Sequence, residues 1–391
     1  MWSILLMMCC AVTVAKAAEP VKNDPELTDW IFFSSEQRLG VIKPDGSDES
    51  YPDFALASQS VWRMGYVSPD GREAELYSLE SGQSWNYDFV NKSIREIPRQ
   101  RGVPLPEGQR YLHDTNELNV FSLFTTDLDG VNREEIFSAT GFAYGVELSP
   151  DGLKVAYHIT SNPERPGYEI CVVDIASKQL TLIASDHQYL HFGPVWSPDG
   201  QWLLYVRCEH LQDPGHDRSD LVISRADGSE HRQLTTGQRQ WFAAALGTPE
   251  RHSSGSNIAI WSPDGRSVTG TLLLPDSQTA WPWATGRPDT DHFNRDYHPE
   301  LAQGGTQICT VDVETRVITP ISKDDPPTWN FRPVWSPDGT QLAFLRADVG
   351  KLPELWVMDA DGGNLRFLSR GLNGTGADHA RWVQLAVTAI E

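Results

Sequence analysis

The chain has 391 residues with 53 acidic and 32 basic side chains, which gives a formal net charge of −21. A surface this acidic repels nucleic-acid phosphates, and no basic cluster in the sequence overrides that repulsion, so we expect no nucleic-acid partner. Five cysteines in so long a chain, two of them adjacent near the N-terminus, also argue against a disulfide framework.

The first 18 residues, MWSILLMMCCAVTVAKAA, are typical of a secretory signal peptide and too short to span a bilayer. Ala15 and Ala17 supply the small residues of a cleavage site, so we expect export to the periplasm or the extracellular space. Cys9 and Cys10 leave lipid anchoring open as an alternative, although Leu-Met-Met-Cys lacks the small residues of a lipoprotein signal. No later segment is long and apolar enough for a transmembrane helix.

One short phrase recurs along the rest of the chain. Ser-Pro-Asp-Gly begins at Ser68, Ser149, Ser197, Ser262 and Ser336, and residues 105–108 are a degenerate sixth copy. An apolar stretch precedes each copy, an alternating stretch follows it, and two further strand-like runs meet at turns such as Ala-Asp-Gly. Four strands per repeat, recurring about every 40–75 residues, are typical of β-propeller blades.

The two ends of the chain predict a seventh blade. Residues 29–45 lack an innermost strand, and residues 379–385 look like an innermost strand with no blade after it. Joining them closes the ring and leaves no unpaired sheet edge. We therefore predict an all-β fold in which residues 19–391 form a single seven-bladed β-propeller domain of four-stranded blades, closed by the N- and C-terminal strands.

Most of the recurring residues have structural explanations. In each Ser-Pro-Asp-Gly turn Pro presets φ, Asp caps the turn and Gly supplies a positive φ. Cys171 and Cys309 occupy matching third strands, and we expect them to be buried thiols that form no disulfide with each other or with Cys208. Four tryptophans at equivalent positions should pack between blades: Trp196, Trp261, Trp335 and Trp382.

Blade topology sorts the loops onto two faces of the disc. The innermost strand starts from one face, the Pro-Asp-Gly turn lies on the other, and the loop between the second and third strands returns to the first. Three insertions, residues 208–219, 236–256 and 273–305, should therefore rise around the same channel mouth, where a propeller carries its function. They are too rich in aromatic residues for disorder.

Histidine, arginine and aromatic side chains gather at this mouth. The candidate catalytic residues are His191, His210, Arg218, His252 and Arg332. The candidate ligand-binding residues are Tyr144, His216, Trp241, Trp281, Trp283, Arg295, His298, Trp329 and His379. Such groups suit an acidic sugar, because aromatic faces stack, guanidinium groups bind carboxylates and imidazoles transfer protons. The alternative is that the aromatic residues only pack the insertions onto the disc.

Within this set we expect His191 and Arg332 to lie nearest the channel axis, because both precede an innermost strand. We also expect the side chains of Arg332 and Arg218 to be lined by solvent. His210 and His216 leave a metal pair open, but their spacing fixes no geometry and we assign no metal ligand.

These repeats resemble the TolB-type (WD40-like, PD40) β-propeller family, whose blades carry the same strand-turn phrase over nearly the whole of this chain. The resemblance implies the fold and leaves the function open. Such propellers also precede the hydrolase domain of prolyl oligopeptidase-like peptidases, but no Gly-x-Ser-x-Gly nucleophile motif occurs here, so we do not expect that activity.

Residues 191–229 look most like a blade of oligogalacturonate lyase, a seven-bladed propeller. That resemblance implies that His210 and His216 match histidines of the lyase and that Arg218 matches an arginine that contacts substrate. The chain departs from the lyase pattern at two places. The metal-ligating His-Pro-His-Pro run is replaced by Asn-Phe-Arg-Pro at residues 330–333, and the slot of the catalytic histidine, residues 257–260, reads Asn-Ile-Ala-Ile.

Two functions stay open. The first is an exported propeller that binds a protein or an anionic oligosaccharide at this mouth. The alternative is a polysaccharide lyase that cleaves uronic-acid glycans by β-elimination. In that reaction Arg218 or Arg332 would neutralise the uronate carboxylate, one of the candidate catalytic histidines would take the proton, and Tyr144 or Tyr205 would protonate the leaving oxygen. The cofactor is unknown, and a divalent metal is expected only for the lyase.

Overall fold

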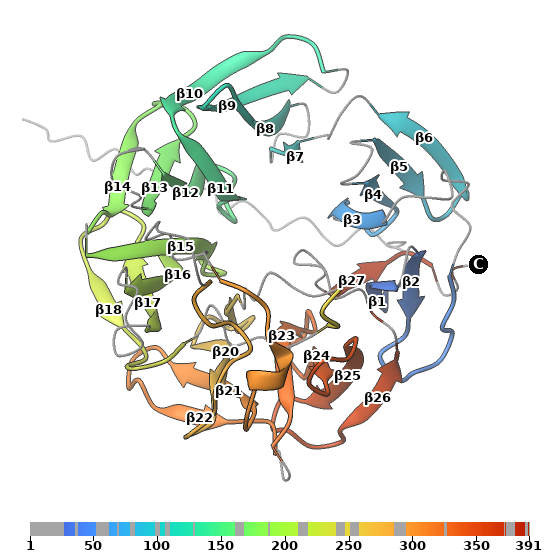
Figure 1. Ribbon diagram of the computed structural model, residues 1–391. Coiled ribbons are helices and arrows are strands. Elements are labelled where there is room, and N and C mark those ends of the chain that lie inside the picture. The colour runs from blue at the N-terminus through green and yellow to red at the C-terminus, as the bar shows by residue number, and fades with distance from the viewer. Residues whose placement is uncertain are drawn as a thin grey trace, which may run out of the picture.

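The computed structural model describes residues 27–35, 38–51, 62–68, 70–78, 83–97, 102–105, 110–127, 130–160, 168–186, 188–209, 218–239, 247–250, 258–284, 295–323, 327–370, 372, 380–387 and 390. The strands form seven antiparallel sheets arranged as blades around a central channel (Figure 1). This confirms the predicted all-β, seven-bladed propeller. Helical structure is limited, in this part of the chain, to the 3-10 turn η2 (Pro299–Leu301), and no helix there is long and apolar enough to cross a membrane.

Six blades follow one another along the chain, and each is a four-stranded sheet whose strands run in sequence order from the channel to the rim (Figure 1). Blades one to three consist of β3 (Trp62–Val67), β4 (Glu73–Ser78), β5 (Ser84–Asp88), β6 (Ser93–Ile97); β7 (Val103–Pro104), β8 (Arg110–Glu117), β9 (Val120–Asp127), β10 (Glu134–Thr140); and β11 (Phe142–Leu148), β12 (Lys154–Thr160), β13 (Tyr168–Asp174), β14 (Leu180–Ala184). Blades four to six consist of β15 (Tyr189–Trp196), β16 (Trp202–Glu209), β17 (Ser219–Arg225), β18 (His231–Gln233); β19 (Ile260–Trp261), β20 (Ser267–Leu273), β21 (Thr306–Asp312), β22 (Ile318–Pro320); and β23 (Trp329–Trp335), β24 (Gln341–Ala347), β25 (Glu354–Asp359), β26 (Arg366–Ser369).

The seventh blade joins the two ends of the chain, as predicted. Its innermost strand is β27 (Arg381–Leu385), which pairs with β1 (Thr28–Ser35), and β2 (Arg38–Ile42) follows outward. Ile31 lies opposite Trp382, so an N-terminal and a C-terminal residue share one sheet. Beyond β2, Val41 and Ser50 exchange backbone hydrogen bonds and mark the outermost position of this blade.

The Ser-Pro-Asp-Gly turns have the predicted geometry. In the blade-four copy the Ser197 hydroxyl donates to Asp199 (2.6 Å) and accepts the Trp202 amide (2.9 Å), while Gly200 has a φ of 67°. The other described copies, which begin at Ser68, Ser149, Ser262 and Ser336, repeat both bonds. These aspartates are therefore turn residues. Most of the degenerate copy, residues 106–108, lies outside the described residues.

Tryptophans link neighbouring blades along the inner ring. In three cases the indole N–H of an innermost strand donates to the blade before it: Trp196 to the Glu147 carbonyl oxygen (3.2 Å), Trp261 to the Val195 carbonyl oxygen (3.1 Å) and Trp335 to the Thr269 hydroxyl (3.0 Å). This confirms the predicted position between blades. Trp382 differs, because its indole donates to Asp29 of its own blade (3.1 Å).

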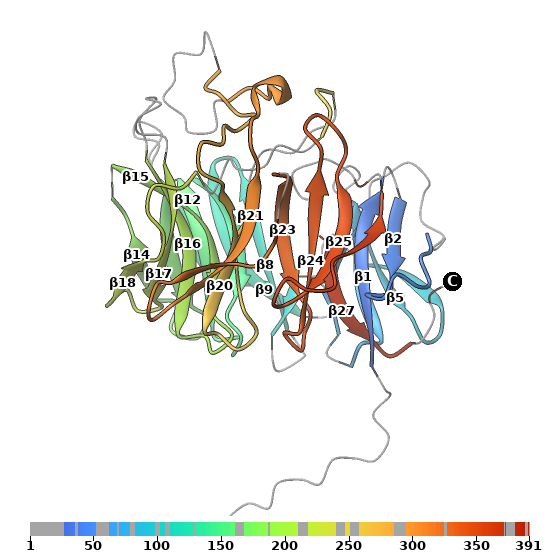
Figure 2. The ribbon, with the colours of Figure 1, turned by 90° about the horizontal axis from the view of Figure 1, so that it is seen from below.

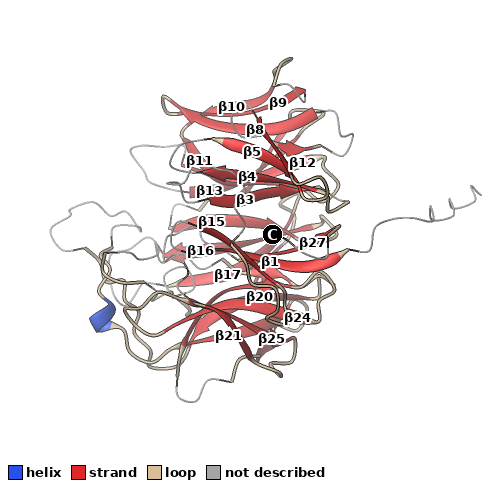
Figure 3. Ribbon diagram, turned by 90° about the vertical axis from the view of Figure 1, so that its right-hand side faces the viewer, coloured by secondary structure: helices blue, strands red, loops and turns tan. Residues whose placement is uncertain are grey.

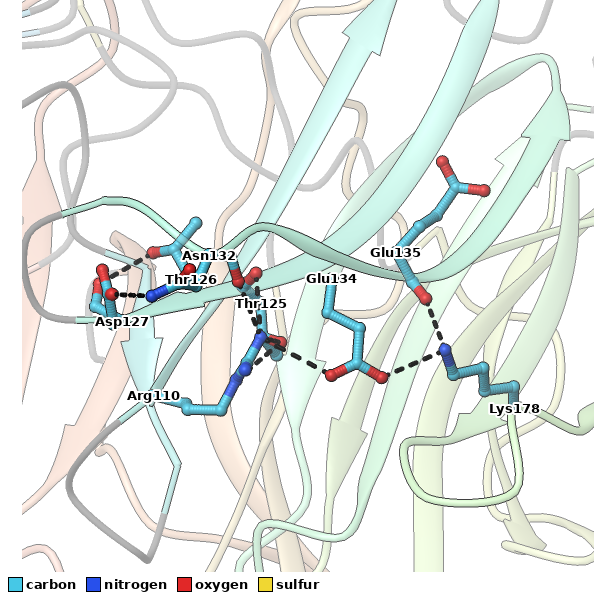
Figure 4. Close-up of polar contacts among 8 residues, drawn as sticks. All are labelled: Arg110, Thr125, Thr126, Asp127, Asn132, Glu134, Glu135 and Lys178. Carbon is cyan, nitrogen blue, oxygen red and sulfur yellow. Dashed lines mark hydrogen bonds and ion pairs between the residues drawn. The ribbon is translucent and has the colours of Figure 1, made fainter.

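At the outer rim the contacts between blades are polar. Lys178, in the turn after β13, donates to the Glu135 carbonyl oxygen (2.8 Å) and lies 3.2 Å from the Glu134 carboxylate, and both acceptors belong to β10 of blade two (Figure 4). Arg110 approaches the second oxygen of Glu134 at 3.7 Å. Because these side chains are largely solvent-exposed, the network contributes little to stability.

The three cysteines of the described chain are buried and form no disulfide, as predicted. Cys171 lies in β13 and Cys309 in β21, which are the third strands of blades three and five. They fill space between blades and are not exposed for chemistry.

Candidate functional site

The blade-five insertion stands on one face of the disc. Its described parts, residues 274–284 and 295–305, run alongside each other between β20 and β21, with bridges from Gln278 to Gln303 and from Trp283 to Arg295. Figure 2 shows this segment and η2 rising from one face, and Figure 3 shows η2 projecting beyond the blades. The Pro-Asp-Gly turn lies at the opposite end of β20, so the insertion occupies the predicted face.

Several predicted ligand-binding residues hold this insertion together. The Arg295 guanidinium lies 3.9 Å from the centre of the Trp283 ring and donates to the Trp281 carbonyl oxygen (3.0 Å). The Trp281 ring lies 4.9 Å from the Tyr297 ring and joins the core cluster that contains Trp329. Arg295, Trp281 and Trp329 are all buried. For these three residues the structure favours packing over ligand contact.

Loops from three places in the chain meet at this insertion. The Tyr297 hydroxyl donates to the Gly247 carbonyl oxygen (2.9 Å), and the Gly247 amide donates to the Lys351 carbonyl oxygen (2.8 Å). Gly247 belongs to the connection from blade four to blade five, and Lys351 to the loop between β24 and β25. We call the described residues 247–250, 274–284, 295–305 and 348–352 the insertion wall.

Arg332 does not line the channel mouth as an exposed side chain, which corrects the expectation for it. Only 2% of the residue is exposed, and its backbone has a φ of 50° at a bulge in β23 between Phe331 and Val334. The equivalent bulges of blades three and four carry Gly145 and Gly193, with φ values of 60° and 56°. Arg332 is therefore a buried arginine in a backbone conformation that favours glycine.

His191 is also buried, and it lies between blades three and four. Its Nδ1 lies 3.2 Å from the Tyr168 carbonyl oxygen of blade three, and its ring packs 5.7 Å from that of Tyr205. Burial lowers the pKa of this imidazole to about 4. A histidine held neutral inside an interface stabilises the packing of two blades.

Three described candidates reach solvent, and each comes from a different blade. Tyr144 is exposed on the innermost strand of blade three. Arg218, at the start of β17 in blade four, is exposed, and its carbonyl oxygen accepts the Glu209 amide (2.8 Å). His298, on the insertion wall, places its Nδ1 2.8 Å from Glu300.

The remaining candidates, His210, His216, Trp241, His252 and His379, lie outside the described residues. Within the described chain no group of three or more His, Cys, Asp or Glu side chains is placed to hold a metal ion.

His158 is a buried residue that the sequence did not single out. Its Nδ1 accepts the Gly193 amide (3.3 Å) of the next blade, and its ring lies 5.8 Å from Tyr144 and 5.6 Å from Phe192. Burial lowers its pKa to about 3. Alternation predicts a second-strand position for His158, but the contact with Gly193 depends on the angle between two blades, which no local pattern encodes.

Glu147 is a second buried titratable residue that the sequence pattern did not indicate. It lies on the innermost strand β11, and its carboxylate accepts the Trp196 amide of the next blade (3.4 Å). Burial raises the pKa of Glu147 to about 7, while the bond from Trp196 and the charge of Arg381 act in the opposite direction. Its charge therefore changes near neutral pH.

The repeated turn phrase, the blade order and the closing sheet together define a seven-bladed β-propeller, and part of its sequence is similar to TolB. Over 89 residues the chain is 33% identical to the Tol-Pal system protein TolB of Anaeromyxobacter sp. (strain K), a match that covers 21% of this chain and 20% of that protein. The match thus spans about a fifth of the relative's length. No family model matches the chain.

Solved structures share the fold at low identity. A puromycin-hydrolyzing peptidase of Mycobacterium tuberculosis superposes with a TM-score of 0.56 and 13% identity over 89% of this chain and 54% of that one. Oligogalacturonate lyase in complex with manganese superposes with a TM-score of 0.52 and 15% identity, covering 88% and 86% of the two chains. At such identities the likeness concerns the fold alone.

Proposed function

We propose that this protein is an exported binding propeller that docks a protein partner on the mouth bearing the insertion wall. The observation that carries the proposal is the wall itself, in which three loops are tied by the contacts among Tyr297, Gly247 and Lys351. A surface held rigid before binding loses less conformational entropy when a partner docks. The similarity to TolB, named as a component of the Tol-Pal system, supports a protein partner.

The outer part of the wall offers an apolar contact. Leu301 of η2 and Val349 of the blade-six loop are both exposed. A Cβ placed on Gly350 would lie 3.7 Å from the Cβ of Pro299, so the two loops that carry these side chains approach each other closely. Their surroundings are charged, with Glu300, Asp348 and Lys351. An apolar centre within a polar rim is the usual arrangement of a protein interface.

The test uses steric blocks on this wall. Proteins captured from an extract of the source organism are purified singly, and their Kd is measured against the wild type, a Leu301→Arg/Val349→Arg variant and a Leu153→Arg control. Leu153 is exposed beside the Pro-Asp-Gly turn on the other face. We expect the wall variant to weaken binding at least tenfold and the control to leave it unchanged. Equal binding by all three forms would refute docking on the wall.

The same protein is incubated with polygalacturonate and other uronic-acid glycans, with and without Mn²⁺. No increase in the ultraviolet absorbance of unsaturated uronates is expected. A steady increase in this absorbance would show lyase activity and would contradict the proposed binding function. Export is tested by N-terminal sequencing of the mature protein, which should begin near residue 18 or 19.

A further inference from the structure

Blades two and three lie across the channel from the insertion wall (Figure 1), and exposed apolar side chains occur on their part of the same mouth. Leu118, at the tip of the β8–β9 hairpin, is 100% exposed, and Phe142 and Tyr144 of β11 are 40% and 52% exposed. The β8–β9 turn joins a second to a third strand, so it lies on the face of the insertions. Isolated exposed apolar residues are ordinary, but a group at a channel mouth marks an interaction site.

Backbone and side-chain hydrogen bonds fix the two elements to each other. The Gly141 amide donates to the Asn119 carbonyl oxygen (2.9 Å) at the hairpin tip. The Asn116 side chain donates to the Ala143 carbonyl oxygen (2.9 Å) and accepts the Ala143 amide (2.9 Å). The exposed side chains therefore stand on a rigid base.

Two carboxylates lie on the strand that leads into this hairpin tip. Asp114 and Glu117 are exposed residues of β8, although desolvation of its carboxyl raises the pKa of Asp114. Asp114 and Asn116 point to the same side of β8 because strand residues alternate, and Asn116 contacts blade three, so Asp114 also faces blade three. β9, β10 and β11 contain no lysine or arginine. We call Asp114, Glu117, Leu118, Phe142 and Tyr144 the acidic–aromatic face.

We propose that the acidic–aromatic face binds a peptide segment in which lysine or arginine alternates with apolar side chains. This inference rests on the proposed function, because it names the chemistry of the partner at that mouth. Phe142 and Tyr144 offer rings to cations and apolar groups, and the carboxylates pair with ammonium or guanidinium groups. The same carboxylates repel uronates, so this side of the mouth disfavours an anionic oligosaccharide.

The test measures fluorescence anisotropy with two labelled peptides of twelve residues, one alternating Lys and Trp among Ser and one with Glu in place of Lys. The variants are Phe142→Ser/Tyr144→Ser and the control Leu153→Ser, which removes a 58% exposed side chain from the opposite face. We expect the wild type to bind the Lys peptide at least tenfold more tightly than the Glu peptide. The affinity for the Lys peptide should fall at least tenfold in the double variant and less than twofold in the control. Added salt should weaken binding.

Two results would overturn the inference: equal binding of the Lys peptide by the double variant and the wild type, or equal binding of both peptides by the wild type. Thermal unfolding of the variants shows whether the fold is retained. The purified partner separates this inference from the proposed function. If Leu301→Arg/Val349→Arg loses the partner and Phe142→Ser/Tyr144→Ser keeps it, the function stands and this inference fails. If neither variant loses it, the proposed function fails.

Discussion

In blades three, four and six, the bulge of the innermost strand contains one residue with a left-handed backbone conformation, and the identity of that residue differs between blades. Blades three and four place Gly145 and Gly193 at the left-handed position, whereas blade six places Arg332 there. A Cβ on Gly145 would lie 3.1 Å from Nδ1 of His158, so glycine is needed at that bulge. At Arg332 a left-handed conformation costs about 1–2 kcal/mol, which the contacts of the buried guanidinium must offset.

We predict that Arg332→Ala destabilises the protein by about 2–4 kcal/mol, because it keeps the left-handed strain and empties the space that the buried side chain fills. Arg332→Gly should lose the same contacts but relieve the strain, so it should be more stable than the alanine variant by about 1 kcal/mol. Urea unfolding of both variants measures the difference. An alanine variant as stable as the wild type would show that the arginine contributes nothing to folding.

The two buried histidines between blades three and four predict an acid-sensitive interface. Burial lowers the pKa of His158 to about 3 and that of His191 to about 4. Between those values and the unfolded pKa of about 6.5, the unfolded chain binds protons that the folded chain does not. Stability is therefore complete above about pH 6.5 and falls on acidification by up to about 1.4 kcal/mol per pH unit for each histidine.

Between pH 6 and pH 5, His158→Gln should lower the number of protons taken up on unfolding by nearly one. The glutamine side chain does not titrate, and its oxygen can still accept the Gly193 amide. Urea unfolding at several pH values gives the slope. Leu153→Gln, an exposed site that carries no titratable group, is the control and should leave it unchanged. An unaltered slope in His158→Gln would mean that the histidine is protonated in the folded protein.

At the scale of strands, the rim of the disc shows how each blade avoids pairing with another molecule. Outer strands of a sheet invite edge-to-edge association unless something interrupts them. The interruptions are bulges in β10, β14 and β26, Pro320 in the short β22, the three-residue length of β18, and Arg95 with Glu96 in β6. Contacts that join blades therefore belong mainly to the inner strands.

This division predicts unequal effects of two mutations. Trp196→Phe removes a buried indole donor, leaves the Glu147 carbonyl oxygen without it and opens space between blades, so we expect a loss of about 2 kcal/mol. Lys178→Met removes the exposed rim contact with Glu134, where solvent screens the charges, and we expect a loss below about 0.5 kcal/mol. Denaturant midpoints compare the two. A larger loss for Lys178→Met would show that rim contacts, and not the inner strands, supply most of the stability between blades.

The strands and the ring could be read from the sequence, because each blade repeats the same local phrase and an open ring would leave edges unpaired. Side-chain placement at the mouth could not. A one-residue bulge between Phe192 and Val195 lies beside His191. Another, between Phe331 and Val334, shifts the alternation at Arg332, which was expected to face solvent. The sequence did not predict the roles of Glu147 and His158, because their contacts join residues of two different blades.

At the scale of the whole ring, closure depends on residues more than three hundred positions apart. The Trp30 indole donates to the Val387 carbonyl oxygen (3.2 Å), and the Ser50 hydroxyl donates to the Ile390 carbonyl oxygen (3.0 Å). The Ala386 amide donates to Gly71 of blade one (2.9 Å), which ties the C-terminal strand to the neighbouring blade. Pairing between such distant segments forms slowly, so we expect the seventh blade to be the last one to form during folding.

A disulfide across this closing sheet should therefore stabilise the protein more than one inside a blade. Asp29 and Gln384 are register partners 355 residues apart, and Glu73 and Asp88 are register partners within blade one. In the chain-entropy model, the longer loop gives Asp29→Cys/Gln384→Cys an advantage of about 3 kcal/mol over Glu73→Cys/Asp88→Cys. Each variant is compared in its oxidised and reduced forms by urea unfolding, so the loss of the Asp29 hydrogen bonds cancels. Thiol titration checks that Cys171, Cys208 and Cys309 remain outside any disulfide. Equal stabilisation by the two disulfides would show that the closing sheet remains paired in the unfolded ensemble, because the ring closure would then restrict no additional freedom.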